Sequence, residues 1–220
     1  MDYQVIKVKE DVLQENSVRA DQLRKILKDK HVYFINVMAS PGSGKTTLLT
    51  NLINRLKSTF RIGVMEADID GDVDAQRISE NTGVRAIQIH TSGACHLTAQ
   101  MVHDSINEFG IDDIDLLFLE NVGNLVCPAE FDTGSDINMM LLSIPEGDDK
   151  PLKYPLMFQV SKIAVITKLD TQLIFDFDIE RCKQNILQRN PKTKIFETSA
   201  LKDQGVEPLA EYITQLIRNK

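Results

Sequence analysis

Apolar residues gather in short runs along this chain, and longer amphipathic segments separate most of them. The runs are rich in Val, Ile, Leu, Phe and Met, as strands buried on both faces are, whereas the segments between them repeat apolar positions at helical spacing. The pattern predicts strands over residues 31–38, 61–67, 85–90, 114–120, 137–144, 162–167 and 194–199.

Helical patterns alternate with these strands. Strand–helix alternation is typical of an α/β fold, so we expect a mostly parallel central sheet with helices on both faces. There is no internal repeat or long linker, and the length suits one domain. We expect residues 1–30 to form a helix packed on the domain of residues 31–220. Helices are predicted over residues 11–29, 72–82, 95–109 and 206–218, and after the loop that begins at residue 39.

That loop, ASPGSGKT, fits the phosphate-loop pattern G-x-x-x-x-G-K-S/T except that Ala39 replaces the first Gly. Gly42 and Gly44 let the backbone wrap around phosphate oxygens, Lys45 reaches the β and γ phosphates, and the Thr46 hydroxyl coordinates Mg²⁺. The motif follows an apolar strand and opens a helix, which is the context it requires. It predicts a P-loop NTPase whose phosphate contacts are Pro41, Gly42, Ser43, Gly44, Lys45, Thr46 and Thr47.

Two later strand ends indicate the base. TKLD is similar to the N-K-x-D motif of GTPases, in which Asp170 accepts hydrogen bonds from guanine and the stem of Lys168 packs along the ring. Thr167 replaces the Asn of that motif, so we expect a lost tether and weaker specificity. TSAL follows the next strand, where Ser199 and Ala200 match the loop whose amide meets the guanine carbonyl. The pair favours GTP over ATP.

Acidic residues at other strand ends are candidates for the magnesium site. FLENVGN offers Glu120 to orient a metal-bound water and Gly123 to sense the γ-phosphate. Asp68 follows another strand, and Asp74 is a weaker candidate because it could simply cap a helix. We therefore predict Lys45, Asp68 and Glu120 as catalytic, with Thr46, Asp68, Glu120 and Asp74 around Mg²⁺.

The chain has few Cys and His residues, yet Cys95 and His96 are adjacent in sequence. They follow one strand and Cys127 follows the next, and loops after parallel strands gather at the same edge of a sheet. Two thiolates and an imidazole suit Zn²⁺ or Ni²⁺. Ordinary packing is the alternative, since free Cys is often buried. Cys182 has no partner in the pattern and is expected to be structural.

Composition narrows the function further. A net charge of −7 and a pI near 5.1 argue against a nucleic-acid binder. No apolar run approaches the roughly 20 residues that span a bilayer, so we expect no membrane partner and a cytoplasmic location.

The motifs SPGSGKTTLL, EADIDGDVDAQRI, SGACHLTAQMV, LFLENVGNLVCPAEFDTG and EGDDKPLKYPLMF together resemble the hydrogenase nickel-incorporation GTPases, the HypB family of the SIMIBI class. The resemblance implies a GTP-dependent homodimer that delivers nickel to the large subunit of [NiFe]-hydrogenase with a small metallochaperone, HypA. It also implies that Cys95, His96 and Cys127 bind Zn²⁺ or Ni²⁺ at the dimer interface. The first thirty residues contain no Cys or His, so the N-terminal metal-binding motifs of some members are not matched.

Other functions remain possible at this stage. The urease nickel GTPases of the UreG type share the fold, but their Cys-Pro-His motif is absent. An ATP-dependent kinase or ligase of the same fold is disfavoured by the TKLD and TSAL pair. A nucleotide-locked scaffold without turnover is a third alternative.

Overall fold

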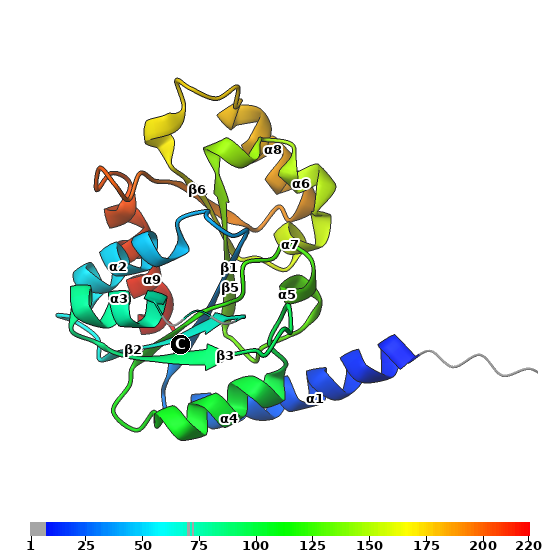
Figure 1. Ribbon diagram of the computed structural model, residues 1–220, viewed down its shortest axis with the longest axis vertical. Helices are drawn as coiled ribbons and strands as arrows, with labels where there is room; N and C mark the ends of the chain where they lie inside the picture. Colours follow the sequence, from blue (N-terminus) through cyan, green and yellow to red (C-terminus); the bar gives the residue numbers. More distant parts are fainter. Residues whose placement is uncertain (1–7, 70, 72) are drawn as a thin grey trace, which may run out of the picture.

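A seven-stranded sheet forms the centre of the chain, with strand order β3-β2-β4-β1-β5-β6-β7 (Figure 1). The computed structural model describes residues 8–69, 71 and 73–220. Every pairing between neighbouring strands is parallel, which confirms the predicted α/β class. The strands are β1 (Tyr33–Ala39), β2 (Ile62–Asp68), β3 (Arg85–His90), β4 (Leu116–Glu120), β5 (Ile137–Ser143), β6 (Ile163–Thr167) and β7 (Lys194–Glu197).

Helices cover both faces of this sheet, as predicted. Successive residues of β1 point to opposite faces, so Ile35 and Val37 pack with α2, α3 and α9, while Phe34 packs with α1 and α4, and Met38 with α5, α7 and α8. The helices are α1 (Val8–Asp29), α2 (Lys45–Leu56), α3 (Val73–Thr82), α4 (Ala99–Phe109), α5 (Cys127–Glu130), α6 (Lys150–Lys153), α7 (Pro155–Gln159), α8 (Ile179–Arg189) and α9 (Val206–Arg218), with 3₁₀ turns at Ile144–Glu146 and Leu169–Thr171.

The first helix, α1, lies beside α4 at the lower edge of the molecule in Figure 1. Leu23 and Leu27 are buried there against α4 and β1. The side chain of Arg24 donates to the Ser135 carbonyl and to Asp132, which anchors α1 to the segment before β5. Residues 1–7 lie outside the described part of the chain, and the division at residue 30 stays a prediction.

The start of α4 differs from the sequence-based expectation. We predicted a helix from Cys95, but α4 begins at Ala99, where the Thr98 side chain accepts a hydrogen bond from Met101 N at 3.3 Å. Cys95 therefore lies in the β3–α4 loop, which turns at Ser92 and Gly93 through positive φ angles of 51° and 93°. Thr98 is a favoured N-cap residue and stops the helix from extending backwards.

Two segments expected as loops contain short helices. The segment of residues 121–134 contains α5, and the acidic segment of residues 146–155 contains α6 and the first residue of α7. Within the described residues, no helix is long and apolar enough to cross a lipid bilayer.

Candidate functional site

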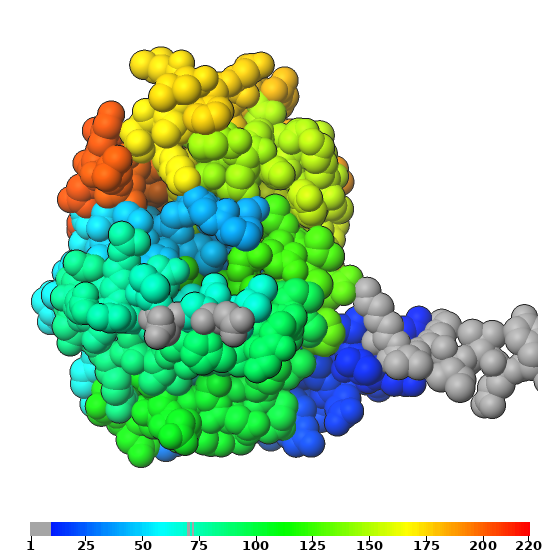
Figure 2. All heavy atoms as spheres, viewed as in Figure 1, coloured from blue at the N-terminus to red at the C-terminus, as the bar shows by residue number. Residues whose placement is uncertain are grey.

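The phosphate loop joins β1 to α2 at the carboxyl edge of the sheet. Gly42 and Gly44 have φ angles of 72° and 95°, which residues with a Cβ rarely adopt. Ala39 is the buried last residue of β1, without a positive φ, so a small residue suffices in place of the first Gly. Lys45 begins α2 and is only 9% exposed. Figure 2 shows the loop reaching the surface between the α3 region and the β5–α7 region.

The loop after β4 packs directly on the phosphate loop. A Cβ added at Gly123 would lie 2.9 Å from Pro41 N, so this close approach requires glycine. The Asn124 N–H donates to the Ala39 carbonyl at 2.9 Å, which extends the contact between β4 and β1 beyond the strands. The predicted γ-phosphate sensor therefore lies beside the predicted phosphate contacts, and both roles stay predictions.

Glu120 ends β4 and is buried beneath the phosphate loop. Its Oε1 accepts a hydrogen bond from the Thr46 hydroxyl at 3.0 Å and lies 4.0 Å from Lys45 Nζ. Burial raises the pKa of Glu120 to about 7, although Lys45 and the Thr46 hydroxyl act in the opposite direction. Its second oxygen, Oε2, has no hydrogen-bond partner among the described residues.

Glu66 is a residue of this site that sequence reasoning missed. It lies on β2 opposite Glu120 in the strand register, is 2% exposed, and accepts a hydrogen bond from the Gln88 amide. Burial first, and the charge of Glu120 second, raise its pKa to about 8. Carboxylate oxygens of Glu66, Asp74 and Glu120 lie within 4.8 Å of one another.

The other acidic candidates occupy different positions. Asp74 lies inside α3, which begins at Val73, so it does not cap this helix as the sequence allowed. Its carboxylate faces Glu66 and Glu120 instead. Asp68, at the end of β2, accepts a hydrogen bond from Gly71 N at 3.0 Å and lies outside that carboxylate group. Its predicted catalytic role stays a prediction.

A cavity of about 180 Å³ lies where the guanine base is expected. The Ser199 hydroxyl donates to Asp170 Oδ1 at 2.5 Å, which orients the carboxylate predicted to read the base. The Asn51 amide donates to the Ala200 carbonyl at 2.7 Å and fixes the second loop to α2. The cavity is lined by Ser43, Gly44, Thr47, Leu48, Thr167, Lys168, Asp170, Ala200 and Leu201.

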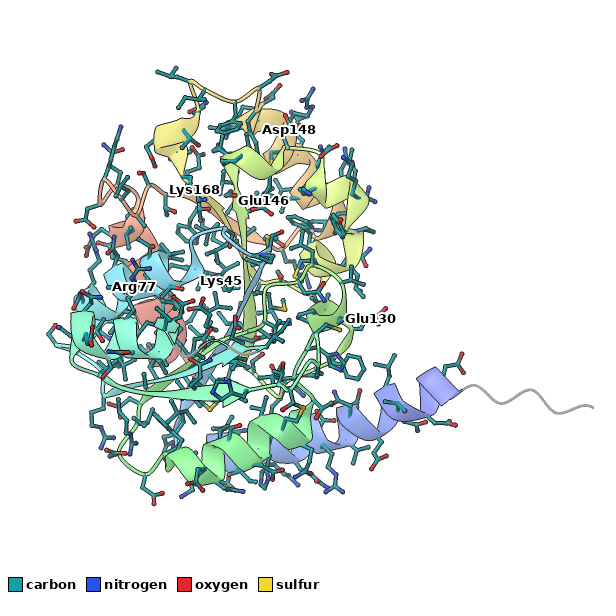
Figure 3. The ribbon with its side chains drawn as sticks, in the orientation of Figure 1. Lys45, Arg77, Glu130, Glu146, Asp148 and Lys168 are labelled. Carbon is teal, nitrogen blue, oxygen red and sulfur yellow. The ribbon has the colours of Figure 1, made fainter. Side chains whose placement is uncertain are left out.

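The expected loss of a tether at Thr167 is wrong for the phosphate loop. The Thr167 hydroxyl donates to the Ser43 carbonyl at 2.8 Å, and both residues are buried. The threonine side chain makes this contact although it is shorter than that of Asn. The neighbouring Lys168, labelled in Figure 3, donates to the Gly42 carbonyl at 2.6 Å. The base-reading segment is thus tied to the phosphate loop at two points.

Cys95, His96 and Cys127 come together at the same edge of the sheet, with ligand atoms within 4.8 Å of one another. Cys95 Sγ lies 3.0 Å from Cys127 Sγ and 3.7 Å from His96 Nδ1. The hydrogen bond to Cys127 raises the pKa of Cys95, and burial lowers the pKa of His96, which favours its neutral form. Two sulfurs and one neutral imidazole could hold Zn²⁺ or Ni²⁺.

Neighbouring side chains hold these ligands in place. The His96 ring stacks on Phe131 with ring centres 3.7 Å apart. The Asn124 amide donates to the Cys95 carbonyl at 3.3 Å, so the loop after β4 contacts the loop after β3. In contrast, Cys182 is buried in the core, where burial raises its pKa to about 12, in agreement with a structural role.

One buried amide joins the two loops to α1. Asn16 is 7% exposed; its Nδ2 donates to the Asp132 carbonyl and its Oδ1 accepts from Ala99 N, each at 2.8 Å. Ala99 starts the helix that follows His96, and Asp132 follows the short helix that carries Cys127. Sequence reasoning missed this contact because it depends on how distant segments pack.

Comparison with known proteins matches this chain to one protein family. A family model for the CobW/HypB/UreG nucleotide-binding domain matches residues 33–197. The chain is similar to the hydrogenase/urease maturation factor HypB of Helicobacter hepaticus, at 42% identity over 96% of this chain and 87% of that protein. It is 41% identical to the hydrogenase maturation factor HypB of Escherichia coli strain K12, over 92% of this chain and 70% of that protein. A crystal structure of HypB from Helicobacter pylori in complex with nickel has a TM-score of 0.86 and 37% identity, covering 93% of this chain and 96% of that one.

Proposed function

The chain belongs to the family of CobW, HypB and UreG nucleotide-binding domains, and on that basis we propose that it is a GTP-hydrolysing metallochaperone that delivers nickel for [NiFe]-hydrogenase maturation. Relatives at about 40% identity carry the name hydrogenase maturation factor, and a similar structure was determined with nickel. Nickel is the cargo in this proposal. The side chains of Cys95, His96 and Cys127, here called the Cys/His group, are the place that receives it.

GTP is the proposed nucleotide. Asp170, oriented by Ser199, reads the guanine edge, and Lys45 binds the β and γ phosphates. The donor set fits a hard cation, because Thr46 and Glu120 offer oxygen atoms and Glu120 Oε2 has no protein partner in the described chain. Thr46 and Glu120 would hold Mg²⁺, which when bound would supply positive charge to neutralise the phosphates. Glu120 orients the attacking water, with Asp68 as a second acid at the neighbouring strand end.

The observation that carries the proposal is the shared loop after β4. Glu120 and Gly123 lie beside the phosphate loop, and Cys127 follows four residues after Gly123. Asn124 connects this loop to the carbonyl of Cys95. A shift of the loop on GTP binding or hydrolysis therefore changes the spacing of the metal ligands directly, as order changes do in GTPase switches.

The remaining assignments extend the proposal. Three ligands leave a coordination position for a second copy of the chain, so we propose a homodimer that GTP favours and that shares the metal site. The small metallochaperone HypA and the hydrogenase large subunit are the proposed partners, Zn²⁺ is an alternative occupant, and the cytoplasm is the proposed location. Urease is a second client class, because the name of one relative includes both enzymes.

The test measures metal content and molar mass together. The purified chain is loaded with Ni²⁺ or Zn²⁺ in GDP or in a non-hydrolysable GTP analogue, then analysed by size-exclusion chromatography with light scattering and elemental analysis. We expect a dimer with additional metal in the analogue, loss of that metal in Cys95→Ala and Cys127→Ala, and retention in Cys182→Ala. Metal content that ignores the nucleotide would refute the coupling.

Two further measurements separate the alternative functions. Competition by ATP against labelled GDP should be weak, because adenine does not offer Asp170 the donors of guanine; strong competition would favour a kinase or ligase. Transfer of ⁶³Ni from the loaded protein to a purified hydrogenase large-subunit precursor should require GTP hydrolysis. Transfer to a urease apoprotein alone would assign the other client.

A further inference from the structure

A row of three asparagine side chains crosses the sheet at the base of the loop after β4. Asn121 follows β4, Asn36 lies in β1 and Asn138 lies in β5, and these three strands are neighbours in the sheet. The Asn121 amide donates to Asn36 Oδ1 at 3.1 Å, and the Asn36 amide donates to Asn138 Oδ1 at 2.9 Å. Asn36 and Asn121 are each 1% exposed, so their hydrogen bond is shielded from bulk water.

The two ends of this asparagine row fix the direction of every amide in it. Asn121 Oδ1 accepts from the Val122 N–H at 2.9 Å, and a backbone N–H can only donate. At the other end, Asn138 Nδ2 donates to the Val160 carbonyl at 3.3 Å, and a carbonyl can only accept. Turning any one amide over would therefore break the hydrogen bonds on both of its sides.

The asparagine row also holds both ends of the segment that carries Cys127. Asn121 stands at the start of this segment, and at its far end the Ser135 hydroxyl donates to Asn138 Oδ1 at 3.1 Å. Gly123, which packs on the phosphate loop, and Cys127 lie between these two points. The row is therefore placed to set where the whole segment begins and ends.

Asn36 occupies a position that suits an apolar side chain. Its neighbours on the same face of β1 are Phe34 and Met38, which belong to two separate apolar clusters. A buried amide costs free energy unless its hydrogen bonds are formed, whereas an apolar side chain of similar size has no such requirement. The amides add direction, because hydrogen bonds fix orientation and apolar contacts do not.

We propose that Asn36 is a positioning residue for GTP recognition. Through Asn121 it sets the course of the backbone at Val122, and so the place of Gly123 against the phosphate loop. This inference rests on the proposed nucleotide function, in which Gly123 meets the γ-phosphate. The base and the other phosphates are bound by segments outside the asparagine row. Asn36 therefore controls the affinity for GTP and has little effect on the affinity for GDP.

The experiment compares two nucleotides in a fluorescence titration. Asn36→Leu removes both hydrogen bonds and keeps a side chain of similar size. We expect its affinity for a non-hydrolysable GTP analogue to fall at least fivefold, while its GDP affinity stays within twofold of the parent's. Ile213→Ala on α9 is the control, because it opens a cavity in the apolar core on the other face of the sheet. It should lower Tm and leave the ratio of the two affinities unchanged.

Further variants keep the test decisive. Asn138→Leu, at a half-buried position, removes the outer partner of Asn36 and should shift the ratio in the same direction. The effects of Asn36→Leu and Asn121→Leu should be less than additive, because the two changes remove one shared bond. An equal ratio in the parent, Asn36→Leu and Asn138→Leu, or an equal shift in Ile213→Ala, would overturn the inference alone. A parent that bound neither nucleotide would refute the proposed nucleotide function and this inference with it.

Discussion

Replacing Thr167 with valine tests whether its hydroxyl ties the base-reading segment to the phosphate loop. Valine has nearly the shape of threonine and the same branched Cβ, so packing and rotamer freedom change little. The change removes the 2.8 Å hydrogen bond to the Ser43 carbonyl at a position only 4% exposed. Leaving a buried acceptor unpaired costs about 1–3 kcal/mol.

That loss is large enough to measure by thermal unfolding. For a chain of this length, each kcal/mol lowers Tm by about 2–4 °C. Thr214→Val on α9 is the matched control: its hydroxyl donates to the Ala210 carbonyl at 2.9 Å, but at a partly exposed position where water can replace it. We expect that control to change stability by less than about 0.5 kcal/mol.

The same variant should also bind labelled GDP more weakly, because Thr167 orients the segment that carries Asp170. Thr167→Asn, which restores the usual GTPase residue, should recover binding and increase the preference for GTP over ATP. If Thr167→Val were no less stable than Thr214→Val and bound GDP as well as the parent, the tether would have no energetic role.

Three further predictions concern other contacts. Gly123→Ala should weaken GDP binding at least tenfold in a fluorescence titration, because its Cβ would lie 2.9 Å from Pro41 N; unchanged affinity would show that the two loops separate easily. In the presence of a chelator and without nucleotide, the Tm of Glu66→Gln minus the Tm of the parent should increase as pH rises from 5 to 9. Because burial raises the pKa of Glu66 from 4.5 to about 8, the stability from its protonated form is fully present below pH 4.5, falls as pH rises, and is lost once pH exceeds 8; a difference independent of pH would contradict this. Cys182→Ser should lose about 1–3 kcal/mol of stability by placing a hydroxyl in the core, while its Ni²⁺ content, measured by elemental analysis, stays equal to the parent's.

Much of the fold was predictable because buried parallel strands are continuous apolar runs. Each predicted strand has its counterpart, and the phosphate loop was evident from glycines whose positive φ angles the structure now shows. The predicted start of α4 at Cys95 was wrong, because Cys95 and His96 precede an amphipathic pattern without interrupting it. Thr98, a favoured N-cap residue, was the signal that could have placed the boundary.

The cluster of three acidic side chains, Glu66, Asp74 and Glu120, could not be found from the sequence pattern alone. Glu66 lies inside an apolar run at the start of the motif EADIDGDVDAQRI, whose later acids drew attention instead, so its sequence context suggests only a polar residue in a strand. Its importance comes from the register of β2 against β4, which places it opposite Glu120. An acid inside each of two buried strands was the available signal, but strand order had to be known before the two could be paired.

The amide of Asn16 has a consequence for how the molecule opens. Because it bonds to the first turn of α4 and to the segment after α5, neither loop that carries a metal ligand can detach without breaking a buried contact to α1. Segments joined in this way open as one cooperative unit, and their amide hydrogens exchange with solvent together. Protection of α1 in hydrogen exchange is therefore expected to rise and fall with the order of the Cys/His loops, which makes this helix a distant reporter of whether the metal site is assembled.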